Sequence, residues 1–145
     1  TVIGYHFNDK GEKLNIVTGD VGLTKIWMDY VQAHNDRNLD KIPKMQVEDI
    51  TMYISDGSIV KGSAEYIKFL SDWFKSSNPK WKVSWMVVNT GEQNKGKNKY
   101  WLTTGNEITE AMDGKEIKRY LVADVNFVDE KIKRINIYTR AKKQE

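Results

Sequence analysis

Three polar side chains stand among apolar neighbours in this sequence, where they could act on a bound molecule. Tyr30 and His34 lie one helical turn apart on an apolar stripe, and Asp124 interrupts the apolar run 121–125. A buried tyrosine hydroxyl can donate to a ligand oxygen, and a histidine can act as a base near neutral pH. Burial would raise the pKa of the aspartate and keep it protonated as a donor. The structural alternatives are a hydroxyl with a protein partner, a helix-end histidine and a surface carboxylate.

Aromatic side chains are the second feature that could serve a ligand. The sequence has five tryptophans, which supply rigid apolar surface suited to a cavity wall as well as to a core. Strand alternation places Trp85 on the same face as Trp81, Val83 and Val87, whereas the direction of Trp101 stays open. Tyr120 shares the face of Asp124. The expected ligand-binding residues are Trp27, His34, Trp73, Trp85, Trp101, Tyr120 and Tyr138, and core packing is the alternative for each of the tryptophans.

Several other kinds of chemistry leave no trace in the sequence. With no cysteine, the chain has no disulfide, no thiolate metal site and no cysteine nucleophile. The two histidines, His6 and His34, lie far apart in the sequence, which argues against a transition-metal site. There is no glycine-rich phosphate loop and no serine elbow. We therefore expect no metal and no cofactor.

Composition limits the partners and the size of the protein. A chain of 145 residues with 39% hydrophobic and 30% charged residues suits one globular domain. The net charge is +3 and the two signs are interleaved, so we expect no nucleic-acid partner. No apolar run reaches the roughly 20 residues of a membrane span. The start at Thr1 without Met slightly favours an exported or periplasmic protein.

The elements that would position these side chains begin with helices. Residues 1–19 predict an N-terminal arm or hairpin, and residues 20–145 a single domain. Apolar residues at helical spacing predict a first helix over 23–34, a short second helix over 39–45 with Pro43 near its start, and a third helix over 63–77. A hairpin over 50–61 separates the last two helices.

The rest of the chain is rich in β-forming residues. Segments 81–90, 100–112, 117–128 and 132–138 predict long strands separated by turns, most simply an antiparallel meander. Helices followed by such a meander indicate an α+β fold, in which about three helices close one face of a curved antiparallel sheet. A hollow between the sheet and the helices would be the binding site.

The order of these elements carries a resemblance to a known superfamily. Its local markers are Val47-Glu48-Asp49 before the first strand of the hairpin, Val60-Lys61-Gly62 before the third helix, and Asp129-Glu130-Lys131-Ile132 before the last strand. Across about residues 20–140 the chain resembles the nuclear transport factor two-like superfamily, which includes ketosteroid isomerases, scytalone dehydratases and SnoaL-like polyketide cyclases. The resemblance implies a cone-shaped, cystatin-like domain.

The same resemblance implies roles for individual residues. Tyr30 falls at the position of the isomerase tyrosine that donates to the oxyanion, and Asp124 lies in the strand that carries its protonated aspartate. The general-base position is occupied by Ile54, so steroid isomerase chemistry is not expected. The pocket histidines of the dehydratases are missing, and Arg140 stands where SnoaL-like cyclases often carry an acidic residue.

Two functions remain open from the sequence. The first is a binding domain with an enclosed, aromatic-lined apolar pocket for a small apolar or aromatic ligand, with a possible homodimer through the sheet. The alternative is a non-metal enzyme of the cyclase, dehydratase or isomerase type, in which Tyr30 and Asp124 polarise a carbonyl. The lack of a clear base slightly favours binding.

Overall fold

The computed structural model describes residues 1–140, so the last part of the predicted 20–145 domain, residues 141–145, lies outside the described residues. The boundary after residue 19 stays a prediction. The elements in chain order are β1 Val2–Phe7, β2 Lys13–Thr18, α1 Leu23–Asn35, a 3₁₀ turn η1 Ile42–Met45, β3 Gln46–Tyr53, β4 Ile59–Lys61, α2 Ser63–Ser77, β5 Lys80–Gly91, a 3₁₀ turn η2 Glu92–Asn94, β6 Lys99–Met112, β7 Lys115–Val128 and β8 Lys131–Arg140.

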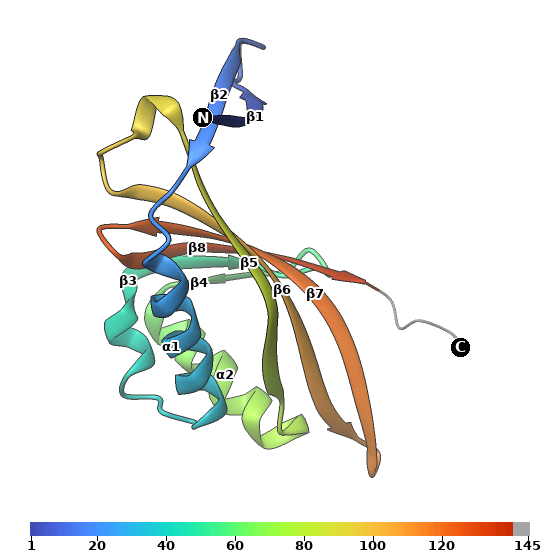
Figure 1. Ribbon diagram of the computed structural model, residues 1–145. Coiled ribbons are helices and arrows are strands. Elements are labelled where there is room, and N and C mark those ends of the chain that lie inside the picture. Colours follow the sequence, from blue (N-terminus) through green and yellow to red (C-terminus); the bar gives the residue numbers. More distant parts are fainter. Residues whose placement is uncertain (141–145) are drawn as a thin grey trace.

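The strands form one curved sheet with α1 and α2 against its concave face (Figure 1). The strand order is β1-β2-β5-β6-β7-β8-β3-β4, and β5 to β8 form the predicted antiparallel meander. The expectation of a wholly antiparallel sheet was wrong at one place, because β3 pairs parallel with β8. A parallel pair needs a long connection, and here α2 and the meander β5–β7 supply it.

The two helices form where the apolar stripes predict them. The buried side of α1 includes Leu23, Trp27, Tyr30, Val31 and His34. In α2, Tyr66 and Leu70 are buried, and the helix ends at Ser77 because Asn78 takes a left-handed conformation that closes helices. The predicted second helix is a single 3₁₀ turn with Pro43 at its start. Two α-helices and one 3₁₀ turn therefore replace the three expected helices.

A β-bulge changes the direction of the side chains along β5. Val83 pairs with Asn106 and Trp85 pairs with Gly105, so Ser84 is an extra residue opposite this stretch of β6. An extra residue reverses which face the following side chains occupy. The prediction that Trp81 and Trp85 share a face was therefore wrong. Trp85 is 46% exposed on the outer face of the sheet, whereas Trp81 faces the helices.

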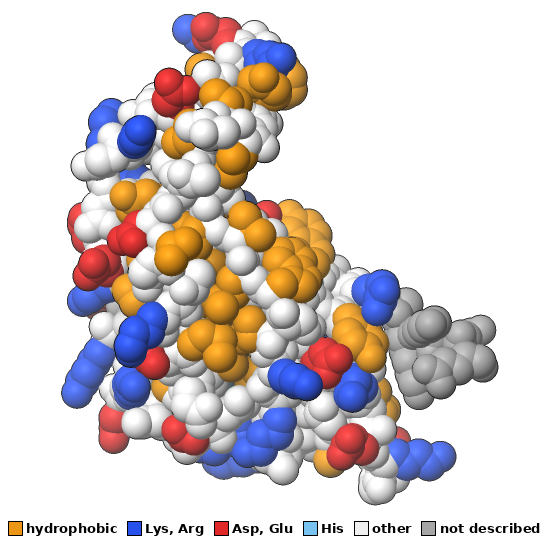
Figure 2. Space-filling model, viewed as in Figure 1, with side chains coloured by type: hydrophobic (Ala, Val, Ile, Leu, Met, Phe, Trp, Pro, Cys, Tyr) orange, Lys and Arg blue, Asp and Glu red, His pale blue; other side chains and the backbone are white. Residues whose placement is uncertain are grey.

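The first two strands form a hairpin that projects from the body of the molecule (Figure 1). It joins the sheet where residues 16–18 of β2 pair with residues 89–91 of β5. Apolar side chains are visible on the hairpin and across the middle of the body in the space-filling view (Figure 2).

Within residues 1–140, none of the helices is both long and apolar enough to cross a bilayer.

Candidate functional site

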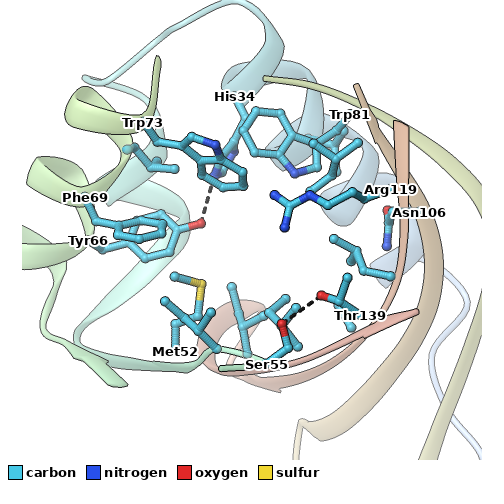
Figure 3. A pocket seen from close by; sticks show the side chains of 18 of the residues that line it. His34, Met52, Ser55, Tyr66, Phe69, Trp73, Trp81, Asn106, Arg119 and Thr139 are labelled. Atoms are coloured by element: carbon cyan, nitrogen blue, oxygen red, sulfur yellow. Dashed lines mark hydrogen bonds between the residues drawn. The ribbon is translucent and has the colours of Figure 1, made fainter. Parts of the chain in front are cut away.

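A cavity of about 540 Å³ lies between the two helices and the concave face of the sheet. Apolar side chains from α1, α2, β3 and the strands β5 to β8 form most of its wall, including Ile54 and Met52 at one side. The aromatic side chains on this wall are Trp27, Tyr30, Tyr66, Phe69, Trp73 and Trp81. Figure 3 shows side chains that line this cavity.

The aromatic rings contact one another through their edges. The ring centres of Trp73 and Trp81 lie 5.1 Å apart with an interplanar angle of 82°. His34 meets Trp81 in the same manner, at 5.4 Å and 74°. Edge-to-face pairs of this kind are favourable beyond the area they bury. Trp81 was not among the predicted ligand-binding residues, although its position at the start of a β-rich segment was available as a signal.

The hydroxyl of Tyr30 is engaged by a protein partner. Tyr30 is 1% exposed and donates to Gln46 Oε1 at 2.7 Å, and Gln46 Nε2 in turn donates to Ser63 Oγ at 3.0 Å. Burial raises the pKa of the Tyr30 phenol well above its ordinary value, and the neighbouring Tyr66 phenol adds to this. The ring of Tyr30 lines the cavity, but its hydroxyl could reach a ligand oxygen only by leaving Gln46.

His34 is neutral and has a partner at each ring nitrogen. Its Nδ1 lies 2.7 Å from the Tyr30 carbonyl oxygen and its Nε2 lies 2.9 Å from the Tyr66 hydroxyl. Because a carbonyl oxygen can only accept, Nδ1 carries the proton, and Nε2 accepts from Tyr66. Burial lowers the pKa of His34 to about 4; the hydrogen bond to Tyr30 opposes this and the charge of Arg37 adds to it. This imidazole is a poor base at neutral pH.

Arg119 is a charged residue of the wall, and it forms an ion pair with Glu110 on β6. Arg119 Nη2 donates to Glu110 Oε1, while Trp73 Nε1 and Ser77 Oγ both donate to Glu110 Oε2 at 2.7 Å. Burial alone would raise the pKa of Glu110, but these hydrogen bonds and the arginine charge hold it below its ordinary value. The arginine side chain reaches into the cavity from β7 (Figure 3).

Sequence reasoning missed this charged pair, although a signal existed. Arg119 is in phase with Leu121 and Ala123 along β7, and Glu110 is in phase with Ile108 along β6. A charged residue on the apolar side of a strand is either paired or directed into a cavity.

Among residues 1–140 no group of three metal-ligating side chains lies close enough to hold a metal ion.

Asp124 does not lie in the cavity, contrary to the expectation from the sequence. Its neighbours Ala123 and Val125 are buried on the concave side, so Asp124 points to the outer face, where it accepts from Thr103 Oγ1 at 2.5 Å. Tyr120 shares that outer face, where Arg140 covers its ring with a separation of 4.8 Å. Strand alternation correctly placed Asp124 and Tyr120 on the same face, but this is the outer face of the sheet and not the concave face.

Three other predicted ligand-binding residues also face outward. Trp85 faces outward because of the bulge in β5. Trp101 faces outward because the next residue, Leu102, is buried on the concave side, and neighbouring side chains of a strand point to opposite faces. Tyr138 is 60% exposed near the end of β8. The cavity wall thus contains four of the predicted site residues, which are Trp27, Tyr30, His34 and Trp73.

Comparison with known proteins adds information about the fold. Neither a protein-family model nor a curated protein sequence matches this chain. Solved structures with a similar fold include a candidate ketosteroid isomerase from Kribbella flavida, with 13% identity over 85% of this chain and 81% of the other and a TM-score of 0.67. A protein of unknown function with a cystatin-like fold from Methylobium petroleophilum has 14% identity over 88% and 82%, with a TM-score of 0.66.

A third similar structure is a candidate SnoaL-like polyketide cyclase from Jannaschia, with 15% identity over 82% of this chain and 83% of the other and a TM-score of 0.64. At these identities the likeness concerns the fold and not the chemistry. The helices, the curved sheet and these neighbours agree with one another. The chain therefore has the α+β, cystatin-like fold of these neighbours, as the order of its elements predicted.

Proposed function

We propose that this protein binds a small apolar or aromatic molecule in the cavity between its helices and its sheet. The observation that carries the proposal is the aromatic wall around a volume of about 540 Å³, which is within the range of small-molecule sites. The body of such a ligand would contact the rings of Trp27, Phe69, Trp73 and Trp81. Burial of its apolar surface would supply most of the binding free energy.

The polar groups near the ligand support binding more than catalysis. Ile54, which stands at the base position of the isomerases by resemblance, lines the cavity and has no proton to exchange. His34 has a pKa of about 4 and both of its nitrogens are engaged. The hydroxyl of Tyr30 donates to Gln46. None of these three residues is ready to move a proton at neutral pH.

Arg119 favours a second candidate, an enzyme of the cyclase, dehydratase or isomerase type that acts on an apolar carbonyl compound. Its guanidinium group in the cavity could polarise a carbonyl group. Asp124, on the outer face, could not share that task. If the bound molecule is a substrate, fresh protein should convert it, and mass spectrometry of the small molecule before and after incubation measures this.

Native mass spectrometry of the purified protein tests the binding proposal. We expect a retained small molecule in the wild type and its loss in Leu121→Trp, because this change extends an indole from β7 into the cavity. Val122→Trp is the matched control, since residue 122 is the neighbour on the outer face. Equal occupancy in the two variants would show that the molecule binds elsewhere.

We also propose a homodimer through the outer face of the sheet. Trp85 and Val87 on β5 and Tyr138 on β8 are 46%, 50% and 60% exposed there, and a second copy could cover these apolar side chains. Sedimentation velocity at rising protein concentration should show a dimer in the wild type and a monomer in Trp85→Lys. A wild-type monomer at every concentration would contradict this proposal.

A further inference from the structure

The residues that line the cavity differ in exposure, and the exposed ones are all polar. They are Ser55, Asp56 and Ser58 in the turn between β3 and β4, and Asp72 and Ser76 on α2. Because these residues lie both on the cavity wall and on the surface of the protein, the cavity meets solvent between the β3–β4 turn and α2. We call this opening the mouth.

Two strand ends complete the mouth. The hydroxyl groups of Thr139 on β8 and Ser55 lie 2.8 Å apart (Figure 3). Leu121 pairs with Thr139, and Arg119 lies two residues from Leu121 on the same face of β7, so Arg119 and Thr139 are diagonal neighbours. The Arg119 side chain is 41% exposed. Its Nη2 donates to Glu110, while its Nη1 makes no hydrogen bond within residues 1–140.

The buried part of the wall has no free donor for a ligand oxygen. The hydroxyl groups of Tyr30 and Tyr66 and the protonated nitrogen of His34 all donate within the protein. The amide of Asn106 donates to a backbone carbonyl oxygen. Trp27 Nε1 has no partner, but it has almost no accessible surface, so a ligand does not reach it. The other buried residues of the wall are apolar.

This difference between the two parts of the wall determines how a ligand with one polar end would lie. In the buried part, the polar end would lose its hydrogen bonds to water and find no donor in exchange, which is unfavourable. At the mouth, the same group keeps its contact with water and finds polar partners. The apolar end of the ligand therefore enters first.

The mouth offers both donors and acceptors to the polar end. Arg119 Nη1 can only donate, the carboxylates of Asp56 and Asp72 can only accept, and the hydroxyl group of Ser76 can do both. A ligand hydroxyl group can pair with each of these. A ligand carboxylate only accepts, so it could not bond to the two aspartates and would be repelled by them.

Resting on the binding function proposed above, we infer that the ligand is an amphiphile whose apolar body fills the cavity and whose single hydroxylated head stays at the mouth. A glycosylated or polyhydroxylated aromatic compound has this chemistry. The body lies against the aromatic wall, and the head remains in contact with solvent. The volume of about 540 Å³ therefore limits the size of the body and not the size of the head.

Equilibrium dialysis with four probes that share a naphthalene body tests this inference. We expect 2-naphthyl glucoside to bind at least as tightly as 2-naphthol, because its sugar stays at the mouth. Naphthalene-2,6-diol should bind about tenfold more weakly than 2-naphthol, because its second hydroxyl group is buried without a donor. 2-Naphthoate should bind more weakly than the glucoside, because its head only accepts.

Leu121→Trp should abolish binding of 2-naphthol and of the glucoside, and Val122→Trp, on the outer face, should preserve both. If 2-naphthol binds but the glucoside does not, the head is enclosed and the inference is wrong, although the cavity binds a ligand. A diol as tight as 2-naphthol, a naphthoate tighter than the glucoside, or a glucoside that still binds Leu121→Trp would also contradict the inference. If none of the four probes binds, the binding function itself is wrong.

Discussion

A neutral histidine in the aromatic wall contributes to the response of this protein to acid. In the native state His34 is buried, hydrogen-bonded at both nitrogens and holds a pKa of about 4, below its ordinary value of 6.5. In the unfolded chain the same imidazole regains an ordinary pKa. Between these two values the unfolded state binds a proton that the native state does not. Acid therefore favours unfolding through this residue.

We predict that the free energy of unfolding falls as the pH drops from 6.5 towards 4, with a contribution from His34 of the order of 3 kcal/mol. Above pH 6.5 this contribution to the pH dependence is absent. Urea unfolding across this range, compared between the wild type and His34→Gln, measures the effect as a difference in slope. Parallel curves for the two proteins would show that the imidazole is not buried in the neutral form.

Tyr30 is the residue for which the sequence and the structure suggest different roles. Because its hydroxyl donates to Gln46, Tyr30→Phe leaves the buried Gln46 oxygen without that donor. We expect a loss of about 1–3 kcal/mol in the free energy of unfolding. Urea unfolding should show almost no loss in Tyr5→Phe, since Tyr5 is 53% exposed. Native mass spectrometry should show the retained small molecule still bound to Tyr30→Phe; its loss would mean that the phenol contacts the ligand.

At the scale of the elements, the bulge in β5 fixes what each face of the sheet carries. It brings the indole of Trp85 over Gly105 on the outer face, where a side chain at residue 105 would have its Cβ atom 2.2 Å from Trp85 Nε1. No real Cβ atom approaches a heavy atom so closely. The glycine is therefore required by the position of the tryptophan rather than by its own backbone conformation.

We predict that Gly105→Ala lowers the free energy of unfolding by about 1–3 kcal/mol, because the Trp85 ring must move. In a Trp85→Ala background the same change should cost almost nothing, since the obstructing ring is gone. A double-mutant cycle by urea unfolding measures this coupling. If the two changes are additive, the indole does not rest on residue 105.

The sequence predicts the elements better than it predicts their faces. The apolar stripes of α1 and α2 and the long strands of the meander are properties of local patterns, so they could be read in advance. The bulge at Ser84 has no local signature, and it moved Trp85 out of the site. The parallel pairing of β3 with β8 depends on a connection through the rest of the fold. The helical stripes predict that Trp27 and Trp73 lie on the cavity wall. For Arg119 the same prediction also needs to know which face of the sheet is concave, and this depends on the whole fold.

At the scale of the whole molecule, the N-terminal hairpin is set apart from the site. No residue of the cavity wall precedes Trp27, and β1 pairs with β2 at the free edge of the sheet. Val2, Ile3, Tyr5 and Phe7 are 43%, 48%, 53% and 67% exposed on this strand. Little apolar surface would therefore be newly exposed by its removal.

We predict that deletion of residues 1–12 changes the free energy of unfolding by less than about 1 kcal/mol and leaves the retention of the small molecule unchanged. Deletion of residues 1–18 should cost more, because it also removes Val17, which is 7% exposed. Urea unfolding and native mass spectrometry measure the two effects. If the shorter deletion abolishes retention of the small molecule, the hairpin contributes to the cavity in a way that its position does not suggest.

The extra residue at Ser84 also decides which positions of distant homologues are equivalent to those in this chain. Side chains alternate between the two faces along a strand, so one extra residue shifts the alternation by one position. In a homologue that lacks the insertion, the residues of β5 beyond this point that align with outward residues of this chain would therefore face inward. An alignment that places the gap a few residues away would equate the outward indole of Trp85 with a wall residue of the other protein. Site residues inherited across this fold should therefore be matched by the face that they occupy in space, and only then by their order in the sequence.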